Sequence, residues 1–129
     1  MAALFALFAV LDFWSFTLRF NRQYPDLYGI DLHERRLQTL VGELPPEAVV
    51  GYVSDLSFDT LDGQTAFFAA QYALAPRVVV MHDSHYVEDL VLGYYSRQID
   101  PLAEAANLGM KLREDFGSGV ALFERESER

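Results

Sequence analysis

An almost continuous apolar run near the start of the chain constrains its fold more than any other feature. Residues 2–20, AALFALFAVLDFWSFTLRF, contain one charged side chain, Asp12, before Arg19. Leu, Phe, Ala and Trp side chains would cover every side of a helix here, and such a helix is buried in a large core or in a bilayer. The rest of this 129-residue chain is too small to surround it. The run therefore predicts a transmembrane helix, close to the lower limit of about 17–25 residues.

Asp12 makes insertion of this helix marginal and suggests a partner. The Leu, Phe and Val side chains favour insertion by about 3–5 kcal/mol, whereas a central carboxylate opposes it by about 3 kcal/mol. Intramembrane carboxylates usually face protein or water, so a second helix beside Asp12 would favour the span. We expect Phe8, Asp12, Trp14 and Phe16 to meet the lipid bilayer and an integral membrane protein partner.

Two other interpretations of the run stay open. It also fits an amphipathic or core-packing helix whose Asp12 faces solvent. A cleaved signal peptide fits less well, because the run lacks a basic n-region and an A-x-A cleavage site.

Arg19 and Arg22 follow the run, and the positive-inside rule then places the rest of the chain in the cytoplasm.

The composition excludes several functional classes. The net charge is −9, and the chain contains a single lysine, Lys111. This balance argues against a nucleic-acid partner, because phosphate contacts need clustered Lys and Arg. The chain has no cysteine, which excludes disulfides, thiolate metal sites and cysteine nucleophiles.

Composition also divides the chain into three parts. We expect a membrane-anchor helix over residues 1–20, a connector over 21–30, and a soluble α/β domain over 31–129. Tyr24 and Tyr28 in the connector suit an interfacial aromatic belt and suit a packed loop equally well.

The pattern after residue 30 alternates helices with strands. Asp31 and Glu34 form a capping-box pattern for a helix that Pro45-Pro46 ends, and Asp100 and Gly109 bound the last helix. The expected strands cover 48–55, 77–82 and 90–95, with a helix over 64–74 and a terminal hairpin of 111–116 and 120–125. Alternation predicts parallel pairing with helices on the sheet faces, and the hairpin adds an antiparallel pair. The expected fold is a small three-layer, Rossmann-like mixed sheet.

An acidic loop follows the first strand, where ligands bind in open α/β sheets. It contains no glycine-rich phosphate motif. Its residues Asp55, Asp59 and Asp62 would suit a divalent cation or sugar hydroxyls. A glycan-binding site here would use Tyr52, Asp55, Asp59 and His82. The alternative is that Asp55 and Asp62 only cap turns and the following helix.

A polar segment after the second strand carries two imidazoles. His82, Asp83 and His85 supply three potential metal ligands within four residues, although their spacing matches no strong zinc signature. A solvated loop is the default alternative, and a general-base role for His82 or His85 is another. No G-x-S-x-G elbow is present, and we expect no cofactor and no catalytic residues.

The aromatic side chains of the domain are a further candidate feature. Their spacing is typical of core residues, although exposure on one face would suit a sugar-stacking platform. The set comprises Tyr52, Phe67, Phe68, Tyr72, Tyr94 and Tyr95.

Several segments between residues 40 and 125 resemble a group of largely uncharacterised bacterial membrane proteins, some of them glycosyltransferase-like. The most distinctive are VGYVSD (50–55), QYALAP (71–76) and DFGSGV (115–120). The resemblance implies a small α/β domain tethered to the bacterial inner membrane on the periplasmic side, and no assigned catalytic residues. The polytopic part of such proteins, where glycosyl transfer would occur, is absent.

The sequence therefore predicts a non-enzymatic accessory or scaffolding subunit of a membrane assembly. The alternatives are a membrane-tethered sugar- or glycan-binding module and a small metal-dependent enzyme.

Overall fold

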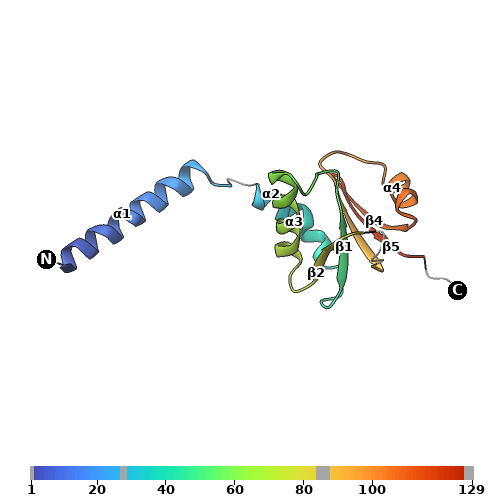
Figure 1. Cartoon of the computed structure of the whole chain (residues 1–129), viewed down its shortest axis with the longest axis horizontal. Coiled ribbons are helices and arrows are strands. Elements are labelled where there is room, and N and C mark those ends of the chain that lie inside the picture. Colours follow the sequence, from blue (N-terminus) through green and yellow to red (C-terminus); the bar gives the residue numbers. More distant parts are fainter. Residues whose placement is uncertain (1, 27–28, 84–87, 127–129) are drawn as a thin grey trace.

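The chain forms one long helix followed by an α/β domain (Figure 1). The computed structural model describes residues 2–26, 29–83 and 88–126. Helix α1 (Ala2–Gln23) extends away from the domain. The elements of the domain are α2 (Ile30–Val41), β1 (Val49–Val53), α3 (Leu61–Leu74), β2 (Val78–Met81), β3 (Leu90–Tyr94), α4 (Pro101–Leu108), β4 (Lys111–Gly117) and β5 (Val120–Glu124). The predicted order of helices and strands is confirmed.

The five strands form a mixed sheet in the order β2-β1-β3-β5-β4. Strand β1 pairs in parallel with β2 and with β3. Strand β5 pairs antiparallel with β3 and with β4. The predicted parallel pairs and the C-terminal hairpin are both confirmed. Gly117, Ser118 and Gly119 all have positive φ in the hairpin turn, a conformation that glycine adopts without steric cost.

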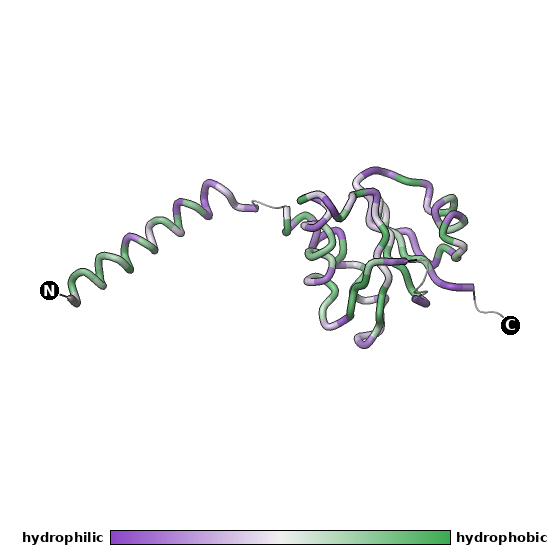
Figure 2. Tube along the Cα trace, viewed as in Figure 1, coloured by the Kyte–Doolittle hydropathy of each residue, from purple (hydrophilic) through white to green (hydrophobic). Residues whose placement is uncertain are grey.

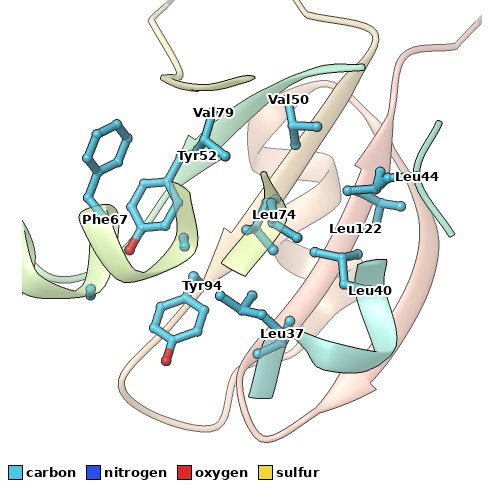
Figure 3. Packing of buried hydrophobic residues seen from close by; sticks show 14 residues of the cluster. Leu37, Leu40, Leu44, Val50, Tyr52, Phe67, Leu74, Val79, Tyr94 and Leu122 are labelled. Carbon is cyan, nitrogen blue, oxygen red and sulfur yellow. The ribbon is translucent and has the colours of Figure 1, made fainter. Parts of the chain in front are cut away.

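Alternate residues of each strand face opposite layers, as strand geometry requires. One set of buried side chains packs between the sheet and α2 and α3, and includes Leu37, Tyr52, Leu74 and Tyr94 (Figure 3). A second, smaller set packs between the sheet and α4, and includes Phe123. The three-layer architecture is therefore confirmed.

The ends of the helices confirm some capping predictions and correct others. Asp100 accepts hydrogen bonds from the Leu102 and Ala103 amides, and Gly109 ends α4 with φ +66°. The capping box at Asp31 was wrong, because α2 begins earlier: Gly29 occupies the N-cap position, and no side chain caps this helix.

Two further helix bounds differ from the prediction. Helix α3 begins at Leu61 instead of residue 64, because the Thr60 hydroxyl accepts a hydrogen bond from the Gly63 amide. Asp62 lies in the first turn of α3 and is not its cap. Helix α2 ends at Val41, before the prolines that were expected to end it.

Candidate functional site

Helix α1 is apolar, and no other described part of the chain buries its stretch Leu4–Gln23. Its 22 residues give a length of about 33 Å, which matches a hydrocarbon core of about 30 Å. Residues Leu4–Gln23 have a mean hydropathy of 1.3, and none of this stretch is buried. Phe8, Trp14 and Phe16 are all exposed, and the hydropathy colouring in Figure 2 shows apolar residues along most of the helix. This helix is long and apolar enough to cross a membrane.

Aromatic and basic side chains gather at the end of α1 nearest the domain. The Phe16 and Phe20 rings stack with centroids 5.9 Å apart, and the Phe20 and Tyr24 rings lie 5.1 Å apart. Arg22 lies in the last turn of the helix. Aromatic and basic residues are typical at the boundary between membrane and water. Tyr24 thus continues the aromatic row of α1, whereas Tyr28 lies outside the described residues.

Asp55, a predicted ligand residue, joins the ends of two strands. Its carboxylate accepts hydrogen bonds from the Ser96 amide and the Ser96 hydroxyl, both at 2.7 Å, and lies 3.7 Å from Arg97. Burial would raise the pKa of Asp55, but the two hydrogen bonds from Ser96, with Arg97, hold it below its usual value. The carboxylate therefore holds the carboxyl ends of β1 and β3 together.

Tyr52, a second predicted ligand residue, lies in the core. It is 2% exposed, its ring meets the Phe67 ring edge-on at 5.3 Å, and its hydroxyl has no hydrogen-bond partner among the described residues. Burial raises the pKa of Tyr52 to about 12, against a lowering by the Ser54 hydroxyl, which lies near the phenol without forming a hydrogen bond of ordinary geometry. A ligand could reach this phenol only after the core opened.

Tyr94 occupies the neighbouring strand and connects it to α2. Its hydroxyl and His33 Nδ1 lie 2.5 Å apart, and the Arg36 guanidinium carbon lies 4.2 Å from the centre of its ring. Arg36 also donates hydrogen bonds to the backbone carbonyls of Tyr95 and Ser118. Burial lowers the pKa of His33, and the Arg36 charge lowers it further, against a smaller opposite effect of Asp26. Sequence reasoning did not identify this cluster, which holds α2 on the sheet.

His82 lies on the other face of the sheet and pairs with a carboxylate. Tyr52 is registered with Met81, so the next residue, His82, points away from the Tyr52 side. His82 Nδ1 lies 3.1 Å from Glu88 Oε2. A Cβ atom on Gly51 would lie 2.8 Å from the same Glu88 oxygen, so Gly51 leaves space for this pair against the sheet.

The two predicted ligand sets are not gathered into one site. The sheet separates Tyr52 from His82, and Asp59 is exposed in the turn before α3, where its amide donates a 3.3 Å hydrogen bond to Ser57. Of the metal set, His85 lies outside the described residues. Within residues 2–26, 29–83 and 88–126, no three His, Asp or Glu side chains are grouped to hold a metal ion.

A hollow of about 820 Å³ lies at the end of the sheet opposite to Asp55, beside the amino end of β3. It is lined by residues of both charge signs, and these pair with one another. Arg125 lies 3.8 Å from Asp89, and Arg113 lies 3.9 Å from Glu124. The geometry indicates surface ion pairs, which contribute little to stability, and it gathers no catalytic group.

The aromatic prediction was correct for four residues and wrong for two. Tyr52, Phe67, Tyr94 and Tyr95 are buried, but Phe68 and Tyr72 are 56% and 73% exposed. With Leu61, these two line a groove of about 450 Å³ on the outer side of α3. Their spacing along the sequence contained this signal, because positions 61, 68 and 72 fall on one side of a helix.

Comparison with family models, curated proteins and solved structures gave no match to this chain.

Proposed function

We propose that this protein is a non-enzymatic accessory or scaffolding subunit of a bacterial membrane protein assembly, anchored by α1. The observation that carries the proposal is that the apolar stretch Leu4–Gln23 of α1 is not buried by the described part of the chain. Burying this surface is favourable by about 25 cal/mol per Å², and the bilayer supplies a solvent for it. The partners are the lipid bilayer and an integral membrane protein.

Asp12 supports the part of the proposal that concerns a protein partner. The residue lies midway along α1, with Leu11 and Phe13 beside it. In hydrocarbon its carboxyl group would be costly without a polar neighbour. A partner helix that donates a hydrogen bond to Asp12 would remove this cost and would also select that partner.

Membrane washing at alkaline pH tests the anchor. Burial raises the pKa of Tyr52, Tyr94 and Tyr95, so the folded domain loses stability as the pH rises above about 10. Such a wash therefore weakens contacts that depend on the folded domain, whereas an inserted α1 stays in the bilayer. We expect the natural chain to stay in the membrane pellet.

A matched variant makes this test specific. Replacing Leu7 and Leu11 by Asp adds two charges to the apolar helix, each opposing insertion by about 3 kcal/mol, and leaves the domain sequence unchanged. We expect this variant to be washed off. Release of the natural chain under the same conditions would overturn the anchor and, with it, the accessory role.

The side of the membrane can be tested separately. We propose that the domain lies on the periplasmic side of the inner membrane, as the sequence resemblance implies. The chain contains no cysteine, so Asn107→Cys, at an exposed position of α4, gives one labelling site. A membrane-impermeant thiol reagent should label it in cells whose inner membrane is intact. Labelling only after lysis would place the domain in the cytoplasm, as Arg19 and Arg22 would require.

A further inference from the structure

The outer face of α3 is apolar, and the described part of the chain leaves it largely exposed, although the Phe68 ring contacts those of Phe58 and Phe67. Leu61, Phe68 and Tyr72 are each more than half exposed. Positions seven and four residues apart lie on one side of a helix, so the three side chains form a continuous strip. Together with Ile30, Gln64 and Thr65 they line the groove of about 450 Å³. Exposed apolar surface of this kind marks an interaction site.

No charged side chain lines this groove, although 22% of the residues in the chain are charged and the net charge is −9. The groove therefore suits an uncharged, apolar occupant. Attraction to an anionic surface is excluded as the source of affinity, because the protein has the same sign of charge. Tyrosine side chains such as Tyr72 are enriched where hydrocarbon meets water, and Phe and Leu are typical of the apolar face of interfacial helices.

The position of the groove indicates which apolar surface it meets. Ile30, the first residue of α2, lines the groove, and α1 ends at Gln23. The intervening chain spans at most about 25 Å. Figure 1 shows α2 and α3 on the side of the domain from which α1 leaves, with α4 on the other side of the sheet. A membrane crossed by α1 therefore lies within reach of the α3 face.

We propose that the outer face of α3 rests on the bilayer surface, with Leu61, Phe68 and Tyr72 inserted at the level of the lipid carbonyls. The inference rests on the proposed anchor and extends it. The domain has a fixed orientation on the membrane, with α3 toward the lipid and α4 toward water. Because the contact is apolar, it needs no anionic lipid and is insensitive to salt.

Single-tryptophan fluorescence in the full chain tests this contact. Trp14 is the only tryptophan, so Trp14→Phe combined with Phe68→Trp leaves one reporter on α3. The matched control is Trp14→Phe with Leu102→Trp, because Leu102 is also more than half exposed but lies on α4. Both variants are reconstituted into phosphatidylcholine vesicles with and without brominated acyl chains.

We expect the tryptophan at position 68 to emit at shorter wavelength and to be quenched at least about twofold more than that at position 102, because an interfacial helix buries its apolar face about 5–10 Å deep. Tyr72→Trp should give the same result as Phe68→Trp. The quenching should be unchanged by high salt and by added phosphatidylglycerol.

Equal quenching at positions 68 and 102 would overturn the proposal. So would a shift in emission at position 68 that depends on the protein-to-lipid ratio without bromine quenching, since a second copy of the chain would then cover the groove. The natural chain, with Trp14 as its reporter, separates the two proposals. Quenching of Trp14 without quenching at position 68 refutes only the α3 contact, whereas an unquenched Trp14 refutes the anchor itself.

Discussion

Asp55 and Ser96 hold the carboxyl ends of two parallel strands together. Both Asp55 carboxylate oxygens are used, one by the Ser96 amide and one by the Ser96 hydroxyl, each at 2.7 Å. In open α/β sheets this edge is where ligands usually bind. Here Asp55, which the sequence predicted to bind a ligand, is hydrogen-bonded to Ser96 instead. This favours a structural role for Asp55.

Removing the Asp55 carboxylate should destabilise the domain. We expect Asp55→Ala to lower the free energy of unfolding by about 1 kcal/mol, since it breaks two charge-assisted hydrogen bonds at a partly solvated site. The exposed Arg97 pair adds little. Chemical denaturation of the chain in mild detergent measures the change.

The pH dependence of this effect identifies its origin. The folded state lowers the pKa of Asp55 below 3.8, so its contribution is present above that pH and is lost as the pH falls below it. Asp59→Ala, in the exposed turn nearby, should change stability by less than about 0.5 kcal/mol. Equal effects at the two positions would contradict the structural role of Asp55.

His33 should make the attachment of α2 sensitive to mild acid. Its pKa in the folded state is lowered from 6.5 by burial and by Arg36, so the unfolded chain binds the proton more readily. Stability is therefore fully present above about pH 6.5 and declines as the pH falls below that value. Unfolding midpoints of the natural chain and of His33→Phe, measured between about pH 5 and 8, should diverge in slope. An unchanged slope in the variant would show that another group titrates.

The main features of the fold could be predicted from the sequence because apolar periodicity and turn residues agree with it. The runs around Val50, Val79 and Leu92 became the parallel strands β1, β2 and β3, and Asp100 and Gly109 bound α4. Helix starts were less certain. Asp31 is a residue type that often caps helices, but the N-cap of α2 is Gly29, in the left-handed conformation. Only the backbone geometry shows which of these two residues begins the helix.

The candidate site was less predictable, because burial and the direction of each side chain depend on tertiary structure. Tyr52 and His82 lie at the ends of adjacent strands, yet the sheet separates their side chains. The Arg36–Tyr94 contact joins positions 58 residues apart, so no local pattern contains it. The spacing of Leu61, Phe68 and Tyr72 already placed them on one face of α3. We expected that face to be buried, because aromatic residues at helical spacing usually are.

Tyr52→Phe should be neutral or stabilising. The hydroxyl is buried and has no hydrogen-bond partner among the described residues, and an unsatisfied buried hydroxyl costs about 1–3 kcal/mol. The variant should also unfold less readily in alkali, because the folded pKa of about 12 means that stability present below pH 10 declines as Tyr52 ionises. Thermal unfolding between about pH 8 and 11 measures both effects. A marked loss of stability would mean that this hydroxyl has a partner.

Phe67 and Phe68 are adjacent on α3, but their substitution should lower the stability of the domain to very different extents. Phe67 is 8% exposed and contacts Tyr52 and Phe58, so Phe67→Ala should destabilise the domain by about 3–5 kcal/mol through loss of burial and formation of a cavity. Phe68 is 56% exposed, and its ring contacts only the rings of Phe58 and Phe67 among the described aromatic residues, so Phe68→Ala should cost about 1 kcal/mol in detergent.

Denaturation of the two variants in the same detergent provides the comparison. If Phe68→Ala destabilised the domain as much as Phe67→Ala, Phe68 would belong to the core, and the apolar strip of α3 would lose its central residue. A large difference, by contrast, would show that Phe68 is not required for folding and that its apolar side chain is available for the lipid surface.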